Sequence, residues 1–126
     1  YYKKEVSVIL NVQENIKRGT VEMLLLALLS EEDMYGYQLC QELDERSEGL
    51  FLLQEGSMYP ILYRMAEKEL VSTRKELVGK RRTRVYYHIE PAGLVYMEKL
   101  KKEYLSIHKG IIKILDSVKG DKGNEE

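Results

Sequence analysis

The chain has 126 residues, of which 44% are hydrophobic and 33% are charged, a length that fits one small domain with or without an appended helix. Its net charge of −1 excludes a uniformly basic nucleic-acid-binding protein, so any contact with phosphate must depend on where the charges lie. The single cysteine, Cys40, cannot form a disulfide within the chain. Its place in a helical pattern beside Leu39 and Leu43 predicts a buried, reduced thiol.

The longest apolar run, residues 23–29, is too short to span a bilayer, which takes about 20 residues. No signal-peptide pattern precedes it, and we therefore expect a cytoplasmic protein without a membrane segment. In the N-terminal arm, residues 1–14, the apolar positions follow neither a strand period nor a helix period. The structure of this arm stays open.

Two helices are expected in the first half of the chain. Residues 15–29 predict a helix whose later half is apolar on every side and should be buried. A second helix is predicted over residues 35–45, with Asp33 as its cap. Gly36 near its start either permits close approach of another backbone or is a tolerated weak helix residue. The connector that follows contains the single phenylalanine, Phe51, which is expected to fill the core.

The stretch GSMYPILYRMAEKEL, residues 56–70, predicts the helix around which the fold is organised. Ser57 can cap it through its hydroxyl group, and Pro60 falls inside the first turn, where its missing N–H costs nothing. The later turns carry a mainly apolar stripe of Ile61, Leu62, Met65 and Leu70. We therefore expect an exposed first turn that meets a partner and later turns that lie in the core.

A two-stranded hairpin is predicted after this helix, with strands at residues 71–77 and 83–89 and a turn at residues 78–80. Four basic residues lie at or beside the turn: Lys80, Arg81, Arg82 and Arg84. A helix with an exposed, aromatic first turn, followed by a short basic hairpin, is the layout of a winged helix-turn-helix.

Charge is unevenly distributed along the chain. Residues 74–84 contain six basic residues and the single acid Glu76, whereas residues 31–48 contain seven acids and the single base Arg46. We therefore expect the molecule to have a basic end, which would approach phosphate, and an acidic end.

The last helix, predicted to open at Glu90 and Pro91, has the clearest periodicity in the chain. Apolar residues spaced alternately three and four apart form a heptad seam: Met97, Leu100, Tyr104, Ile107, Ile111, Ile114 and Val118. A second stripe lies beside the seam: Leu94, Leu105, Ile112 and Leu115. Because one stripe suffices for packing on a single domain, the two stripes predict a homodimer whose interface is the seam.

The expected fold class is α+β, mostly α: a winged helix-turn-helix with a two-stranded β-wing and a long C-terminal dimerisation helix. The DNA-binding domain spans residues 15–90 and the dimerisation helix residues 91–119. The polar tail, residues 120–126, should fray.

The chain contains three stretches, YGYQL, GSMYPILYRM and RTRVYYHIEPAG. In the order of these stretches and the distances between them, the chain resembles the PadR family of bacterial transcriptional regulators. The resemblance covers roughly residues 15–118, and the ordered set is specific although each fragment alone is weak. It implies a homodimer that represses its target promoter, binds an inverted-repeat operator and is relieved by a small ligand. The chain departs from the family at Met58, where Leu is usual, at Glu90, where Thr commonly caps the last helix, and in lacking the Trp of the first wing strand.

The resemblance also implies which residues contact DNA. The family motif Gly-x-Leu-Tyr-Pro maps onto residues 56–60, and the same helix adds Tyr63, one turn after Tyr59, and Arg64. With the basic hairpin, the expected DNA-contacting residues are Tyr35, Gly56, Ser57, Met58, Tyr59, Tyr63, Arg64, Lys80, Arg81, Arg82 and Arg84.

In multidrug-responsive family members, an aromatic residue on the dimerisation helix lines a cavity between the subunits. Tyr104 is the nearest counterpart here, so Met97, Leu100 and Tyr104 form the candidate effector pocket for a small aromatic or hydrophobic molecule. No metal or other cofactor is expected, because His88 and His108 lie on different elements and no metal-ligand spacing occurs. No phosphate loop, nucleophile elbow or carboxylate pair is present, and we expect no enzyme activity.

Other interpretations stay open from the sequence. The two tyrosines could pack against the domain, Arg64 could pair with Glu67 or Glu69, and the basic run could be a solvated turn. The protein could also be an adaptor that uses the heptad helix to bind another protein without binding DNA, or a small-molecule carrier. The basic hairpin tip favours the regulator, because an adaptor has no need for a phosphate-binding hairpin.

Overall fold

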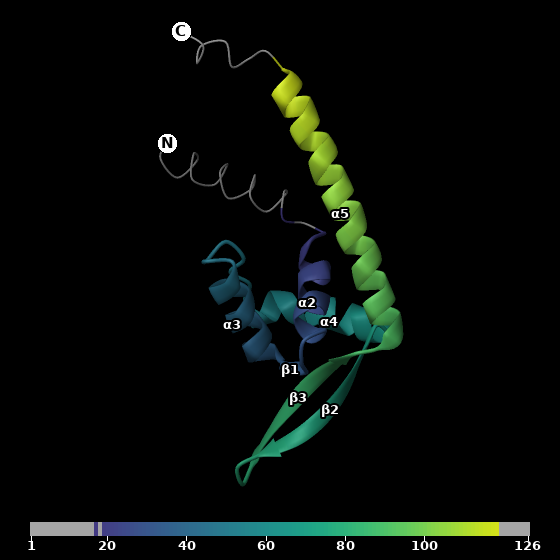
Figure 1. Ribbon diagram of the computed structural model, residues 1–126. Helices are drawn as coiled ribbons and strands as arrows, with labels where there is room; N and C mark the ends of the chain where they lie inside the picture. The colour runs from purple at the N-terminus through teal and green to yellow at the C-terminus, as the bar shows by residue number, and fades with distance from the viewer. Residues whose placement is uncertain (1–16, 18, 119–126) are drawn as a thin grey trace.

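Figure 1 shows a helical body from which a long hairpin and a long C-terminal helix extend in different directions. This computed structural model describes residue 17 and residues 19–118. The elements in chain order are α2 (Val21–Leu29), β1 (Met34–Tyr35), α3 (Gly36–Arg46), α4 (Glu55–Glu67), β2 (Val71–Val78), β3 (Arg82–Ile89) and α5 (Pro91–Ser117). The predicted α+β winged helix-turn-helix with a long C-terminal helix is confirmed. The N-terminal arm (1–14) and the polar tail (120–126) lie outside the described residues.

The core lies where α2, α3 and α4 meet the sheet and the start of α5. Side chains without exposed surface come from the three helices: Leu25, Leu26, Leu39, Met58, Leu62 and Met65. Tyr87 and Ile89 of β3 and Met97 of α5 complete the cluster. Burying one such Leu or Met contributes roughly 1.5–3 kcal/mol. A helix of 9 residues, such as α2, is marginal in isolation and is therefore stabilised by these neighbours.

The helix predicted over residues 15–29 is interrupted by a turn. The expected helix began at residue 15, but residues 19 and 20 form a turn in which Gly19 has a φ of +88°, a conformation that favours glycine. In this turn the Thr20 hydroxyl donates to the Lys17 carbonyl at 2.6 Å. α2 therefore begins at Val21, and the predicted burial of its later half is confirmed for most of its leucines.

The start of α3 also differs from the prediction. Its N-cap is Tyr35, which makes no side-chain capping hydrogen bond, so the prediction that Asp33 caps this helix is wrong. Asp33 contacts the wing instead. Phe51, predicted to fill the core, is half-buried at its edge, with the Lys17 ammonium 5.4 Å from the centroid of its ring.

The predicted two-stranded wing is confirmed, and β1 adds a third strand that the sequence did not indicate. The antiparallel sheet has the order β1-β3-β2. β2 and β3 pair over their whole length, from Val71 opposite Ile89 to Val78 opposite Arg82. Gly79, with a φ of +72°, makes the turn between them. Because β1 directly precedes α3, its pairing with β3 ties the wing to the helical body.

α5 starts at Pro91, as predicted, and packs on the body through its first turns. A Cβ on Gly93 would clash with the carbonyl oxygen of Leu70, a backbone atom that cannot move aside easily. Met97 is buried and Leu100 half-buried, whereas the rest of the seam is exposed. Among the described residues, none of the helices combines the length and apolarity needed to cross a membrane.

Candidate nucleic-acid interface

The first turn of α4 is exposed, but it is built differently from the prediction. α4 begins at Glu55 with Gln54 as the N-cap, so Ser57 lies within the first turn and does not cap it. Pro60 lies in the helix interior, where it has no N–H to donate to the carbonyl of Gly56 four residues earlier. Gly56 and Ser57 are both exposed, which leaves the Ser57 hydroxyl accessible to a partner.

Met58 is the one predicted DNA-contacting residue on α4 that the structure removes from the surface. Its side chain has no exposed area, and its sulfur lies 3.8 Å from the sulfur of Cys40 on α3. Met58 is therefore a core residue, and a direct contact between its side chain and DNA is ruled out. Cys40 itself is half-buried. Its burial, and to a smaller extent the nearby Glu55 carboxylate, raise the pKa of its thiol and so favour the protonated form.

The Tyr59 side chain is partly buried against the domain and partly exposed. Its side chain is 43% exposed, while its hydroxyl lies so close to Gly36 that a Cβ added there would be 2.7 Å from the oxygen. Partial burial, with a further contribution from Glu55, raises the pKa of the Tyr59 hydroxyl. The alternative in which this tyrosine packs against the domain is thus correct for its hydroxyl end, and the rest of the ring stays accessible.

Tyr63 and Arg64 are exposed on the same helix. Tyr63 lies one turn after Tyr59 and is 67% exposed. Within the part of the chain that the structure describes, Arg64 forms no ion pair, so the alternative pairing with Glu67 or Glu69 does not occur there. Both side chains are therefore available for an external partner.

The tip of the β2–β3 hairpin carries three exposed cations, Lys80, Arg81 and Arg82. None of them forms an ion pair within residues 19–118 or with residue 17. Figure 1 shows the tip as the part of the hairpin farthest from the helices. These three charges are thus placed where an extended anionic surface can reach them without meeting the acidic parts of the protein.

The part of the wing that contacts β1 and the turn before it, called the base from here on, holds two cations in contact with aromatic rings. The Arg84 guanidinium lies 4.2 Å from the centroid of the Tyr35 ring, and the Arg74 guanidinium lies 5.0 Å from that of Tyr86. The two tyrosines meet edge to face at 5.5 Å. Tyr35 and Arg84, both predicted to contact DNA, therefore stack on each other in a ladder that joins β1, β2 and β3.

Asp33, in the turn before β1, joins two of the wing's side chains. Its carboxylate accepts hydrogen bonds from Arg74, and its Oδ1 lies 2.7 Å from Nδ1 of His88. Arg74 also donates to Glu76 at 2.7 Å. Burial alone would raise the pKa of Asp33, but the hydrogen bonds from His88 and Arg74 outweigh burial and lower it. The sequence contained no signal for this role of Asp33, because Asp33 is 41 and 55 residues from its partners.

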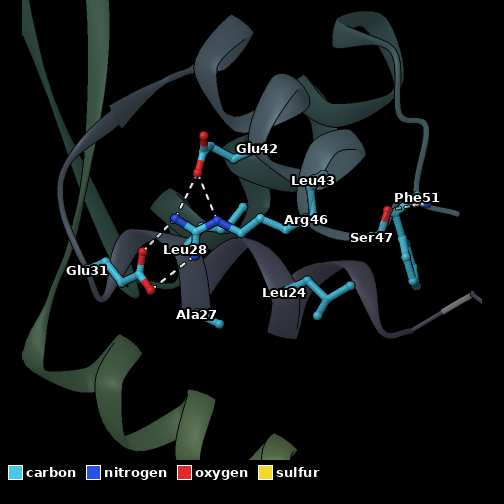
Figure 2. Close-up of a pocket in the computed structure, with 9 residues that line it drawn as sticks. All are labelled: Leu24, Ala27, Leu28, Glu31, Glu42, Leu43, Arg46, Ser47 and Phe51. Atoms are coloured by element: carbon cyan, nitrogen blue, oxygen red, sulfur yellow. Dashed lines mark hydrogen bonds and ion pairs between the residues drawn. The ribbon is translucent and has the colours of Figure 1, made fainter. Parts of the chain in front are cut away.

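The acidic end of the molecule is organised by Arg46. Its guanidinium bonds to Glu31 at 2.7 and 3.1 Å and to Glu42 at 2.8 Å, and the hydrogen bonds to Arg46 lower the pKa of Glu31. Figure 2 shows this bridge beside a hollow between α2 and α3. The hollow has a volume of about 300 Å³ and is lined mainly by Leu24, Ala27, Leu28, Leu43 and Phe51. None of the candidate effector residues on α5 lines it, so it is a different place from the predicted pocket.

The predicted dimer seam leaves the body of the domain after its second member. Met97 and Leu100 pack on the core, and the later seam residues are 43–65% exposed: Tyr104, Ile107, Ile111, Ile114 and Val118. Leu94, Leu105, Ile112 and Leu115 of the second stripe are exposed as well. The Tyr104 ring stacks on His108, with their centroids 5.9 Å apart. The apolar surface of α5 therefore finds no partner among the described residues.

The family model for the transcriptional regulator PadR-like family matches residues 25–99, more than half of the chain. This chain belongs to the PadR-like family of transcriptional regulators. The match runs from α2 to the start of α5, so it contains the wing, α4 and Tyr59 with Gly36, and it ends before the exposed part of the seam.

Solved structures of PadR family members have the same fold. A PadR family transcriptional regulator from Eggerthella lenta DSM 2243 is 25% identical, with a TM-score of 0.77 over 93% of this chain and 97% of that chain. A PadR family transcription regulator from Clostridium difficile R20291 is 33% identical, with a TM-score of 0.68 over 77% of this chain and 99% of that chain. Bacillus subtilis PadR, solved in complex with operator DNA, shares the fold at 17% identity and a TM-score of 0.60, over 66% of this chain and 46% of that chain.

Proposed function

We propose that this PadR-like regulator binds operator DNA as a homodimer and represses transcription. The exposed start of α4 enters the major groove, where Ser57, Tyr59, Tyr63 and Arg64 contact base edges and phosphates. The hairpin tip lies along the neighbouring backbone. Two copies related by a two-fold axis would read an inverted repeat.

The observation that carries this proposal is the cluster of Lys80, Arg81 and Arg82 at the hairpin tip. The chain as a whole is nearly neutral, and the nearby Arg74 is already bonded to Asp33 and Glu76. Three cations without acidic partners among the described residues, at the most projecting point of the sheet, are complementary in charge to a phosphate backbone. Each phosphate that such a cation neutralises adds about 0.9 to the salt slope of binding.

The direct test is fluorescence anisotropy with labelled duplexes of about 30 base pairs that tile the region upstream of the protein's own gene, at two salt concentrations. We expect salt-dependent binding that Arg81→Ala/Arg82→Ala weakens, with a salt slope shallower by about 2. Lys102→Ala/Lys109→Ala is the matched control, because it removes the same charge from exposed positions of α5. A wild-type protein that binds no duplex at low salt, or a tip variant that binds as the control does, would contradict the proposal.

The homodimer is supported by the exposed seam of α5. A helix that only packed on its own domain would not present Ile107, Ile111 and Ile114 to solvent at 49–65% exposure. We expect Ile111→Glu to convert the protein to a monomer in sedimentation equilibrium and to weaken operator binding strongly, since each half-site would then be bound alone. If the variant stays dimeric, the seam is not the interface. If wild type is a monomer, the adaptor interpretation of the seam becomes the stronger one.

We also propose that an effector acts at the dimer interface, beside Met97, Leu100 and Tyr104. A small aromatic or hydrophobic molecule bound between the subunits would change the separation of the two α4 helices and so the affinity for an inverted repeat. The fluorescent probe 1-anilinonaphthalene-8-sulfonate is expected to bind the dimer saturably, and Tyr104→Ala is expected to weaken that binding. Unchanged probe binding by Tyr104→Ala would place the effector elsewhere.

A further inference from the structure

Gly36 of α3 and Tyr59 at the exposed start of α4 lie against each other. A Cβ on Gly36 would lie 2.7 Å from the Tyr59 hydroxyl oxygen and 3.1 Å from its Cε1 and Cζ atoms. All three atoms belong to the one tyrosine. The space that a side chain at position 36 would fill is therefore occupied by the end of the Tyr59 ring.

The backbone gives no other reason for glycine at this position. Gly36 does not have a φ in the left-handed region, unlike Gly19, Gly49 and Gly79. It is the first residue of α3, where alanine is accepted at least as well as glycine. What distinguishes Gly36 is thus its contact with Tyr59.

We propose that Gly36 is a positioning residue for DNA recognition, because its missing side chain sets where the Tyr59 ring lies on the DNA-facing side of α4. This inference rests on the proposed function. One end of the ring is held on α3 and the rest is exposed, so the ring meets the duplex already oriented. A side chain that is ordered before binding loses less conformational freedom when it binds.

Tyr63 provides the internal comparison. It lies one turn later on α4 and is 67% exposed, against 43% for Tyr59. The three atoms nearest to a Cβ at position 36 all belong to Tyr59, and none of them belongs to Tyr63. A side chain at position 36 would therefore meet the Tyr59 ring first, and Tyr63 serves as the reference ring on the same helix.

Replacing Gly36 by alanine is expected to move the ring and leave the fold intact. The clashing atoms are the far end of a side chain, which can rotate away from the new methyl group, whereas a clash with backbone would have to shift a helix. The fold would thus persist while the aromatic contact with DNA is misplaced. A misplaced contact to a base edge costs about tenfold in affinity, without changing the number of phosphates neutralised.

The experiment measures DNA binding and ring position separately. In anisotropy with the operator duplex, we expect Gly36→Ala to bind about tenfold more weakly with an unchanged salt slope. In protein labelled with ε-¹³C tyrosine, the Tyr59 resonance is identified by its loss in Tyr59→Phe. We expect Gly36→Ala to shift this resonance and leave that of Tyr63 in place.

Removing the Tyr59 hydroxyl should relieve the closest contact of the alanine, at 2.7 Å, and leave the two contacts at 3.1 Å, which a small shift of the ring can absorb. In the Tyr59→Phe background, where the 2.7 Å contact is gone, Gly36→Ala is expected to change affinity by at most about twofold. In the matched Tyr63→Phe background it should keep its full effect. If Gly36→Ala alone fails to fold, the double variant Gly36→Ala/Tyr59→Phe must fold and bind as Tyr59→Phe does.

Several outcomes overturn the inference: wild-type affinity in Gly36→Ala, an unshifted Tyr59 resonance, or an equal loss in the two phenylalanine backgrounds. None of these affects the proposed function, which is judged by wild type and by Arg81→Ala/Arg82→Ala. Conversely, a wild-type protein that binds no duplex defeats the proposed function and the recognition role together. The ring resonance would then still report whether Gly36 positions Tyr59.

Discussion

The tip of the β2–β3 hairpin and its base, the part that contacts β1, carry similar side chains and use them differently. At the tip, Lys80, Arg81 and Arg82 have no ion-pair partner within the described residues. At the base, Arg74 is bonded to Asp33 and Glu76, and Arg84 stacks on an aromatic ring. Basic composition alone therefore does not identify the phosphate-binding residues. The tip cations are available to a partner, and the base cations join the wing to the body.

Charge reversal at the tip should have the largest effect on DNA binding. Arg82→Glu removes one attraction and adds one repulsion, and we expect about a hundredfold loss of affinity at roughly 0.1 M salt. The thermal midpoint should stay unchanged, because Arg82 has no described partner to lose. Anisotropy and circular dichroism melting check the two halves of this expectation, with Lys102→Glu as the control. A large drop in midpoint would show that the tip is also structural.

The same reversal at the base should act mainly on stability. Arg74→Glu would bring a third carboxylate next to Asp33 and Glu76 and would remove the guanidinium from the Tyr86 ring. We expect a lower thermal midpoint than for Arg82→Glu, and a smaller loss of affinity when both variants are measured well below their midpoints. Equal thermal midpoints for the two variants would mean that Arg74 at the base contributes no more to stability than Arg82 at the tip.

The base should also make stability depend on pH through Asp33. Its pKa is lower in the folded protein than the ordinary value of 3.8, so the carboxylate stabilises the fold above that pH, and the contribution is lost as the pH falls through the folded pKa. In urea denaturation, wild type is expected to be more stable than Asp33→Asn near neutral pH, with the difference decreasing as the pH falls below 3.8 and vanishing below the folded pKa. The lowered pKa of Glu31 acts in the same range but is common to both proteins. A difference that persists in acid would assign the effect to packing.

The smallest effect is expected for Arg84→Lys. The charge is kept, so the salt slope should not change, but the planar guanidinium 4.2 Å from the Tyr35 ring is lost. We expect a loss of about 0.5–1 kcal/mol in the free energy of unfolding. Arg81→Lys at the tip is the matched control and should leave stability unaltered. Equal unfolding free energies for the two lysine variants would mean that the stack contributes nothing.

Sequence periodicity predicted the wing well and the start of α4 poorly. The strands were expected at residues 71–77 and 83–89 and lie at Val71–Val78 and Arg82–Ile89, because alternation and a turn glycine are local signals. For α4, the local signals of Ser57 and Pro60 favoured a later start, but the helix begins at Glu55 and Met58 packs in the core against Cys40. Tertiary packing therefore outweighed the local capping preference.

The sequence named candidate DNA-contacting residues, and the structure shows how exposed each of them is. Of the predicted DNA-contacting residues on α4, Met58 proved buried, while Tyr63 and Arg64 are exposed. Tyr35 and Arg84 were expected to face DNA, and they stack on each other at the wing base. No pattern within the sequence could show this, because residues 35 and 84 meet only once β1 pairs with β3.

By itself, the sequence determined the order of the elements, the basic hairpin turn, the apolar seam of α5 and the membership in a family of regulators. These depend on spacings within one element or between neighbouring elements, where helix and strand periods apply directly. Only the tertiary structure decided which cations are engaged, that Asp33 joins the wing, and that the Tyr59 ring lies on Gly36. The reason is that each of these is a contact between segments distant in sequence, and its geometry exists only after the helices have packed against the sheet.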